Sequence, residues 1–138
     1  ERFKEKNGSV NKGWFISNLH GGCWMRYPDL ELGREKPFEQ MTIRYGTNSE
    51  RAGCRIRVLL NPTIEGQGDK RKLNGGEEIG VFVVESTSGW ETFKEFTQPV
   101  KISKPGKHDL FLVLEQGDSK AGNALVNIDW FELSFAKP

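Results

Sequence analysis

The sequence predicts an all-β domain, a sandwich or a barrel, and three observations lead to that class. Apolar residues recur at every second position in several short runs, which places one set of side chains on each face of a strand. Glycines fall between these runs, where turns need positive φ. None of the 138 residues belongs to a pattern that resembles an amphipathic helix of three or more turns. Many short strands separated by turn signals are typical of sandwiches and barrels.

Six runs are expected to form strands. Two of them alternate strictly, and two others are rich in the β-branched and aromatic residues that strands favour. In the last run, Ile128 and Trp130 share one face, whereas Phe131, Leu133 and Phe135 share the opposite one. This parity indicates either a bulge or a strand buried on both sides. In chain order the runs are residues 22–27, 42–45, 54–60, 81–84, 110–115 and 127–135.

The longest polar interval runs from residue 61 to residue 78 and is predicted to be a long loop. It holds four glycines, a proline and the basic group Lys70-Arg71-Lys72, which is interpreted as solvated. No repeat and no internal domain boundary is visible. Residues 1–138 are therefore expected to form one domain, cut from a larger protein.

Charge and composition exclude several partners. Twenty basic residues balance nineteen acidic ones, so no field favours nucleic acid or an anionic membrane. The longest apolar run has five residues, from Leu110 to Leu114, whereas a membrane helix needs about 20. Cys23 and Cys54 are not in the spacing of a zinc site, and they leave two readings open: free buried thiols, or a disulfide that would indicate an oxidising compartment.

No motif indicates catalysis. His20 and His108 have no nucleophile turn near them in the sequence, and no argument selects a pair among the many carboxylates. The tryptophans are more informative. Trp90 directly follows the turn-like residues 86–89 and Trp14 follows Gly13, positions that suit presentation of a ring, whereas Trp24 and Trp130 lie in strand-like runs and are expected to be buried.

Five segments together resemble the motif series of the family 6 carbohydrate-binding modules, and the resemblance covers nearly the whole chain. The related families 35 and 36 share the architecture and stay open. Each motif alone is weak, whereas five in this order are fairly specific. The segments are residues 22–27 (Gly-Cys-Trp-Met-Arg-Tyr), 42–45, 86–93 (Ser-Thr-Ser-Gly-Trp-Glu-Thr-Phe), 106–113 and 127–133 (Asn-Ile-Asp-Trp-Phe-Glu-Leu).

The resemblance implies a β-sandwich of jelly-roll type with a sugar site among the loops at one edge. Two aromatic rings and an asparagine form that site in the family. Here they correspond to Trp90, to Phe15 with its neighbour Trp14 as an alternative, and to Asn127. An aromatic face attracts the slightly positive C–H groups of a pyranose ring, and an amide both donates to and accepts from hydroxyls. Such a site therefore needs no charge.

The sequence also departs from the family pattern. Cys23 stands where an aspartate is usual, and the segment of residues 17–22 is longer than usual. These departures leave the ligand open among xylan, β-glucans and agar-type galactans, and they leave open a second site on the concave face. The resemblance further implies a structural calcium ion, with Glu1 and Asp129 as carboxylate ligands. Calcium takes six or more oxygens, so carbonyls and water would have to complete the site.

The sequence thus predicts a monomeric, secreted, non-catalytic module that binds a poly- or oligosaccharide. The module is expected to concentrate an attached glycoside hydrolase on its substrate, with no nucleic-acid or membrane partner. A protein-recognition or adhesion sandwich with Trp90 and Trp14 as interface anchors is the alternative. A small glycan-active enzyme is the third and least supported reading.

Overall fold

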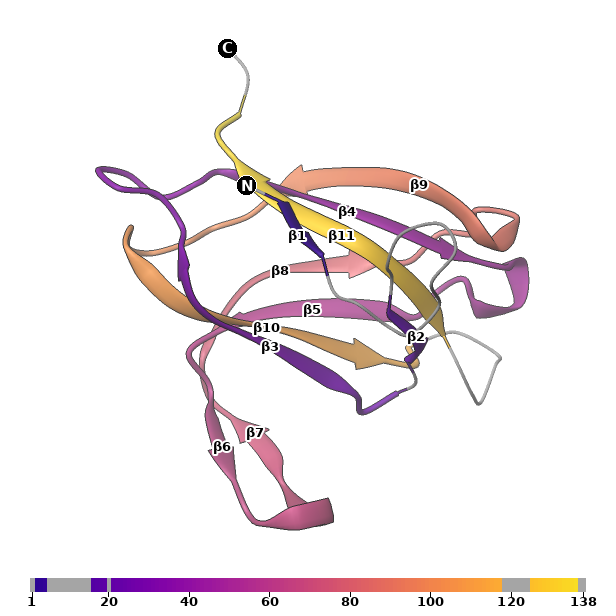
Figure 1. Ribbon diagram of the computed structural model, residues 1–138, viewed down its shortest axis with the longest axis horizontal. Coiled ribbons are helices and arrows are strands. Elements are labelled where there is room, and N and C mark those ends of the chain that lie inside the picture. The colour runs from indigo at the N-terminus through magenta and orange to yellow at the C-terminus, as the bar shows by residue number, and fades with distance from the viewer. Residues whose placement is uncertain (1, 5–15, 20, 118–124, 137–138) are drawn as a thin grey trace.

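The computed structural model describes residues 2–4, 16–19, 21–117 and 125–136. Two antiparallel sheets lie face to face and form a β-sandwich with the strand arrangement of a jelly roll (Figure 1). The predicted fold class is therefore confirmed. The described residues contain no helix with the length and apolar composition that a membrane span requires.

One sheet has five strands in the order β1-β11-β4-β9, with β2 also paired to β11. Its centre is formed by β11 and β4, which run antiparallel with Phe131 opposite Ile43. The edge strand β9 was not expected from the sequence, because its Lys and Glu residues interrupt any apolar alternation. The strands are β1 (Arg2–Lys4), β2 (Ile16–Leu19), β4 (Gln40–Thr47), β9 (Gly89–Pro99) and β11 (Val126–Ser134).

The other sheet has four strands in the order β3-β10-β5-β8. It contains four of the six predicted strands, each with bounds shifted by a few residues. Two short 3-10 turns, η1 (Ser49–Arg51) and η2 (Gly68–Lys70), lie in the connections. The strands of this sheet are β3 (Trp24–Glu31), β5 (Arg55–Leu60), β8 (Glu77–Val83) and β10 (Lys107–Glu115).

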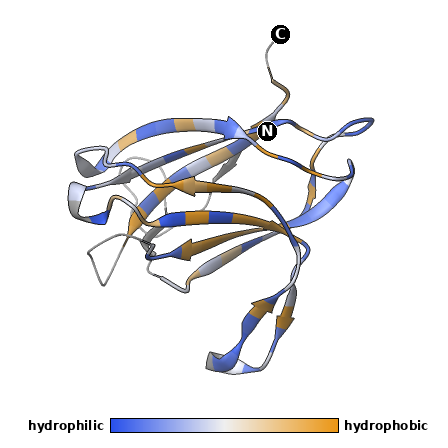
Figure 2. Ribbon diagram, turned by 180° about the vertical axis from the view of Figure 1, so that it is seen from behind, coloured by the Kyte–Doolittle hydropathy of each residue, from blue (hydrophilic) through white to orange (hydrophobic). Residues whose placement is uncertain are grey.

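The core fills the space between the sheets, and the alternation that predicted the strands produces it. Figure 2 shows hydrophobic and hydrophilic residues alternating along several strands. Most inward residues of the four-stranded sheet are buried, and Tyr27 meets Phe131 edge to face with ring centroids 4.9 Å apart. The core members with no exposed surface on β5 and β10 are Ile56, Val58, Leu60, Leu110, Leu112 and Leu114.

The change of parity in the last predicted strand is a bulge. Ile128 pairs with Tyr45 and Trp130 pairs with Arg44, so two residues of β11 advance against one residue of β4. Ile128 and Phe131 consequently both belong to the core. Trp130 is buried as expected, at 7% exposure, but it lies outside that core cluster and not beside Ile128.

The prediction of a long loop at residues 61–78 is wrong. This interval contains a two-stranded hairpin of β6 (Thr63–Glu65) and β7 (Lys72–Asn74), with Ile64 opposite Leu73, and β8 begins at Glu77. Strands of three residues are too short for alternation to reveal them. The basic group is exposed, as the sequence indicated.

The structure also decides two further expectations, the state of the two cysteines and the burial of Trp24. Cys23 and Cys54 are both free thiols, the first half-buried and the second fully buried, so the disulfide alternative is wrong. Trp24 is half-buried and not a core residue. It points outward because it pairs directly with Val113, which alternates with the inward Leu112 and Leu114.

We expect the fold to lose stability as the pH rises above about 9. Burial raises the pKa of the Cys54 thiol from 9.0 to about 11. Burial also raises the pKa of the Tyr45 hydroxyl from 10.0 to about 12. The unfolded chain releases these two protons at lower pH than the folded chain, so the free energy of unfolding falls through this window. Each complete shift corresponds to about 2 to 3 kcal/mol.

Urea unfolding followed at a series of pH values between about 8 and 12 measures this effect. The Cys54→Ala variant should lose less stability than the parent between pH 9 and pH 11, the window set by its thiol. The matched Cys23→Ala variant should keep the parental slope. Equal slopes in the parent and in Cys54→Ala would show that the buried thiol does not contribute.

Candidate functional site

Trp90 lies on a distortion of the edge strand β9. Tyr45 pairs with Lys94 and Thr47 pairs with Gly89, so β9 traverses five residues while β4 traverses two. The extra residues of β9 bulge out opposite Gly46. A Cβ atom on Gly46 would lie 2.7 Å from the Trp90 carbonyl oxygen, so only glycine permits this approach. The bulge leaves the Trp90 side chain half-exposed at the end of the sandwich.

Asn127 reaches the same point from the neighbouring strand. It pairs with Gly46 across β11 and β4, and its Nδ2 donates a hydrogen bond of 3.0 Å to the Trp90 carbonyl oxygen. The amide thus passes over a residue that has no side chain. Asn127 is 7% exposed, so this bond is largely shielded from water. The structure therefore brings Trp90 and Asn127, two of the predicted ligand-binding residues, into one fixed unit.

Two buried threonines hold the turn that precedes Trp90. The Thr47 N–H donates to Thr87 Oγ1 at 3.0 Å, and the Thr87 N–H donates to the Thr47 carbonyl at 3.1 Å. The Thr87 hydroxyl in turn lies 2.9 Å from the Gly89 carbonyl and 3.1 Å from the Thr47 carbonyl. Thr47 Oγ1 donates to the Leu125 carbonyl at 2.6 Å. These bonds attach the turn before Trp90 to the end of β4 at Thr47, and Thr47 is attached in turn to Leu125, directly before β11.

Arg51 contributes the charge at this site. Its guanidinium carbon lies 5.2 Å from the centroid of the Trp90 ring, a cation–π distance. The 3-10 turn η1 directly after β4 positions this side chain. Sequence reasoning missed Arg51 together with Gly46, Thr47 and Thr87. The only signal was the cluster of small polar residues before Trp90, which indicates a turn but not its anchoring.

The predicted second ring, Trp14 or Phe15, lies outside the described residues, and so does His20. The described part of the site offers a half-exposed indole, a buried amide and a guanidinium. Such a set can stack against an apolar ring face and position hydroxyl groups, and it supplies no nucleophile or general base. His108 is elsewhere, with Nδ1 2.9 Å from Asn61 Nδ2 and Nε2 2.8 Å from the Lys104 carbonyl.

Of the two predicted calcium ligands, the structure describes only Asp129. Asp129 accepts a hydrogen bond of 3.0 Å from Arg44 Nε, so a guanidinium already neutralises it. Glu1 lies outside the described residues, and the described strand β1 pairs Lys4 with Trp130 and Arg2 with Glu132. No three His, Cys, Asp or Glu side chains of the described part gather as a metal site. The calcium ion at Glu1 and Asp129 stays a prediction.

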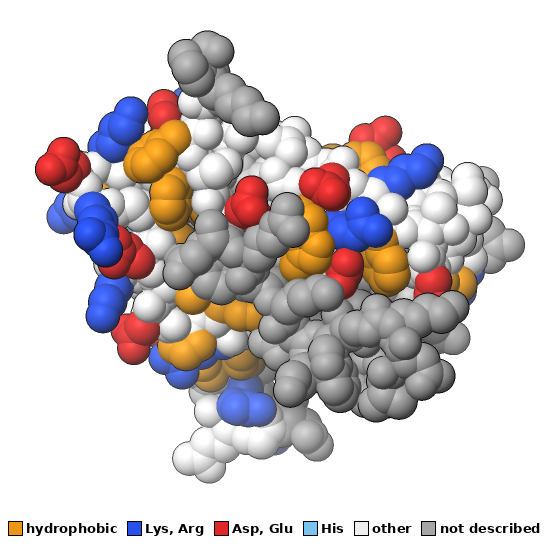
Figure 3. Space-filling model, turned by 45° about the horizontal axis from the view of Figure 1, so that its top comes forward, with side chains coloured by type: hydrophobic (Ala, Val, Ile, Leu, Met, Phe, Trp, Pro, Cys, Tyr) orange, Lys and Arg blue, Asp and Glu red, His pale blue; other side chains and the backbone are white. Residues whose placement is uncertain are grey.

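Charges elsewhere on the surface are mixed. Figure 3 shows Lys and Arg side chains close to Asp and Glu side chains on the face drawn there. A cavity of about 700 Å³ lies at the opposite end of β4 from Trp90, with Phe38, Phe135 and Lys36 among its lining residues. Lys36 already lies 5.0 Å above the Phe135 ring. This cavity shares no residue with the Trp90 site.

Comparison with known proteins places this geometry in context. The profile described as Carbohydrate binding module (family 6) matches residues 3–135. No curated protein matches the chain.

Several solved structures are similar in fold. A β-1,3-glucan-binding CBM6 from Bacillus halodurans is 23% identical, with a TM-score of 0.71 over 97% of this chain and 95% of that one. A family 6 module from Clostridium cellulolyticum, in complex with xylose, is 24% identical, with a TM-score of 0.67 over 96% and 86%. A family 43 arabinoxylan arabinofuranohydrolase from Bacillus subtilis, in complex with cellotetraose, is 19% identical, with a TM-score of 0.67 over 98% of this chain and 24% of that one.

Proposed function

Because this chain belongs to the carbohydrate-binding modules of family 6, a family of non-catalytic binding modules, we propose that it binds a poly- or oligosaccharide through Trp90 and Asn127. The Trp90 indole stacks against one sugar ring, and the Asn127 amide bonds to a hydroxyl at its rim. Trp14 or Phe15 supplies the second ring.

The observation that carries this proposal is the coupling of Asn127 to Trp90 across Gly46. A hydrogen bond of 3.0 Å fixes the amide relative to the backbone that carries the ring. The two threonines fix the turn before it. A site whose aromatic and polar groups are held before the ligand arrives loses less conformational entropy on binding. The geometry therefore favours saccharide recognition over an incidental surface tryptophan.

The similar structures suggest several candidate ligands and do not single out one. The Bacillus halodurans neighbour binds β-1,3-glucan, and the Clostridium cellulolyticum neighbour is in complex with xylose. Neutral β-glucans and xylan are accordingly the first polymers to test, with agar-type galactans beside them. A slot built on loops at the edge of a sandwich suits chain ends or short stretches of a polymer.

The biological setting is part of the same proposal. The Bacillus subtilis neighbour carries its similar region within a larger glycoside hydrolase, of which the match covers 24%. A secreted glycoside hydrolase attached to this module would be held close to its substrate, which raises its effective concentration there. The module itself acts as a monomer, and a calcium ion at Glu1 and Asp129 would be structural.

Affinity electrophoresis against laminarin, xylan, barley β-glucan and agarose tests the proposal. We expect one of these neutral polymers to retard the chain and the Trp90→Ala variant to migrate as if no polymer were present. Loss of a central aromatic anchor costs about 2 kcal/mol or more, which is about thirtyfold in affinity. Phe135→Ala, which removes an exposed aromatic ring at the opposite end of the sandwich, is the matched control and should keep the parental retardation.

The same experiment distinguishes a saccharide-binding module from the alternative function, protein recognition. A protein-recognition sandwich predicts no retardation by any of the polymers. Retardation that persists in Trp90→Ala would contradict the site, although the chain would still be a saccharide binder.

A further inference from the structure

Arg51 lies over the ring of Trp90, and the fold brings these two residues together from separate segments. The guanidinium carbon is 5.2 Å from the centroid of the indole, within the distance of a cation–π contact. Both residues are half-buried. Arg51 ends the 3-10 turn η1 after β4, whereas Trp90 lies on the bulge of β9. The contact therefore depends on how these two segments are held against each other.

Hydrogen bonds connect the two segments on both sides of η1. On one side Thr47 bonds to Thr87 in the turn that leads to β9. On the other side the Gly53 N–H donates to the Val84 carbonyl at 2.9 Å, and the Val84 N–H donates to the Cys54 carbonyl at 2.8 Å. Since η1 lies between these two points, its position relative to the start of β9 is fixed.

The backbone of Arg51 is fixed as well. Its N–H donates to the Asn48 carbonyl at 3.2 Å, and its carbonyl accepts a hydrogen bond of 3.3 Å from the Cys54 N–H. Cys54 has no exposed surface and belongs to the core, so it anchors the end of the turn. The Arg51 side chain therefore starts from a defined point beside the Trp90 ring.

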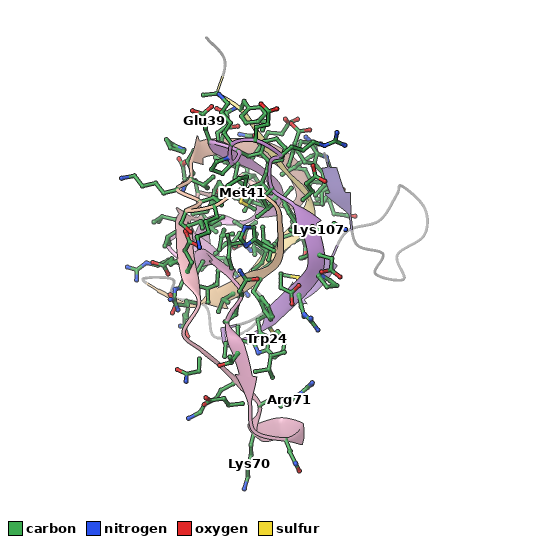
Figure 4. All side chains as sticks on the ribbon, turned by 90° about the vertical axis from the view of Figure 1, so that its left-hand side faces the viewer. Trp24, Glu39, Met41, Lys70, Arg71 and Lys107 are labelled. Carbon is green, nitrogen blue, oxygen red and sulfur yellow. The ribbon has the colours of Figure 1, made fainter. Side chains whose placement is uncertain are left out.

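A second tryptophan shows how differently a ring can be held. Arg71 lies 5.9 Å from the centroid of the Trp24 ring, and Figure 4 shows Trp24 at the base of the β6–β7 hairpin with Arg71 farther toward its tip. Trp24 also packs against Phe111, with ring centroids 5.6 Å apart. Within the described ranges, no aromatic ring packs against Trp90 in this way. Arg51 is thus well placed to orient the Trp90 ring.

A guanidinium suits this task for physical reasons. A half-exposed indole that nothing orients loses conformational freedom when a sugar stacks on it, and this loss weakens binding. A guanidinium is planar and weakly hydrated, so it stacks on an aromatic face while the N–H groups at its edge keep their own hydrogen bonds. A cation on one face of the ring therefore restricts its rotation before any ligand arrives.

We propose that Arg51 is a positioning residue of the Trp90 site. Its guanidinium covers one face of the indole and holds the ring so that a sugar stacks on the opposite face. Arg51 acts through Trp90 and not by contact with the sugar. The proposal rests on the saccharide binding proposed above, and it adds the group that makes the Trp90 ring a platform with a single open face.

Fluorine NMR of the chain labelled with fluorotryptophan tests whether Arg51 orients the ring. The chain has four tryptophans, and the resonance that disappears in Trp90→Phe belongs to Trp90. We expect Arg51→Met to shift this resonance and to leave the other three in place, because it removes the charge above one ring only. Arg51→Lys keeps a cation there and should shift the Trp90 resonance less. Lys94→Met, which removes an exposed cation of the same strand, should shift none of the four.

Affinity electrophoresis measures the consequence for binding. The probe is whichever of laminarin, xylan, barley β-glucan and agarose retards the parent chain, at a series of concentrations that gives the dissociation constant. Arg51→Met should bind it about two- to fivefold more weakly, the effect of removing a cation from a partly exposed ring. Arg51→Lys should recover most of this loss, and Lys94→Met should bind as the parent does. Urea unfolding of Arg51→Met should stay close to that of the parent, since the side chain lies outside the core.

Three results would overturn the proposal. An unchanged Trp90 resonance in Arg51→Met would show that the guanidinium does not orient the ring. An unchanged or higher affinity of Arg51→Met would show that the cation does not help, and a higher one would place it on the face that the sugar uses. Equal losses in Arg51→Lys and Arg51→Met would assign the effect to packing and not to the cation. If no polymer retards the parent, the proposed function fails, and the fluorine resonances still decide whether Arg51 orients Trp90.

Discussion

The Phe131→Ala variant is expected to lose about 3 to 5 kcal/mol of unfolding free energy, the largest stability effect expected of the variants considered. Phe131 has no exposed surface and lies on the central strand β11, opposite Ile43 of β4. Its ring meets Tyr27 of the opposite sheet edge to face at 4.9 Å. Truncation therefore leaves a cavity between the two sheets and removes a contact that connects them.

Urea unfolding at neutral pH measures the loss as a shift of the midpoint at an unchanged slope. Phe135→Ala is the matched control, because Phe135 belongs to the same chain segment but is 41% exposed. It contacts Phe38 and Lys36 at the end of the sandwich and should cost about 1 kcal/mol or less. Equal losses of unfolding free energy in the two variants would show that packing between the sheets stabilises the fold no more than the exposed contacts of Phe135.

The sequence predicted the sandwich because long strands with one buried face leave a periodic signal. Residues 54–60 and 110–115 alternate over their whole length, and the structure pairs them in the centre of the four-stranded sheet. The hairpin of β6 and β7 left no such signal, and neither did β9. The two strands of the hairpin have three residues each, and the phenylalanines of β9 are separated by charged residues that face solvent on an edge. Short or edge strands depend on pairing partners far away in the sequence.

The candidate site was predictable only in part, for a related reason. Trp90 and Asn127 were singled out by the motifs that contain them, and the structure places them together. Gly46 is one glycine among sixteen in the sequence, and nothing local shows that another strand passes over it. Thr87 is a small polar residue in a turn, and its complete burial follows from the neighbouring strand. Close approaches between strands are properties of the fold that single residues do not reveal.

Gly46→Ala is expected to abolish saccharide binding while the sandwich stays folded. The new methyl group would lie 2.7 Å from the Trp90 carbonyl oxygen and 3.2 Å from the Gly89 carbonyl oxygen. Both neighbours are backbone atoms, so the bulge of β9 must move away from β4. The movement separates the Trp90 carbonyl from Asn127 Nδ2, so the ring and the amide no longer keep a fixed position relative to each other. We therefore expect a loss of affinity at least as large as that of Trp90→Ala, about thirtyfold or more.

Retardation by the neutral polymer and urea unfolding, measured on the same preparation, separate this effect from unfolding. The stability loss should be about 1 to 3 kcal/mol, because overpacking is confined to the end of one edge strand. Gly21→Ala is the control: its Cβ would lie 3.4 Å from the Gln116 backbone nitrogen, an ordinary contact, and both properties should stay parental. Full binding by Gly46→Ala would contradict the model in which the close approach of β4 and β9 positions Trp90. Since alanine adds only a methyl group and no polar atom, a loss of binding without unfolding can be assigned to that displacement.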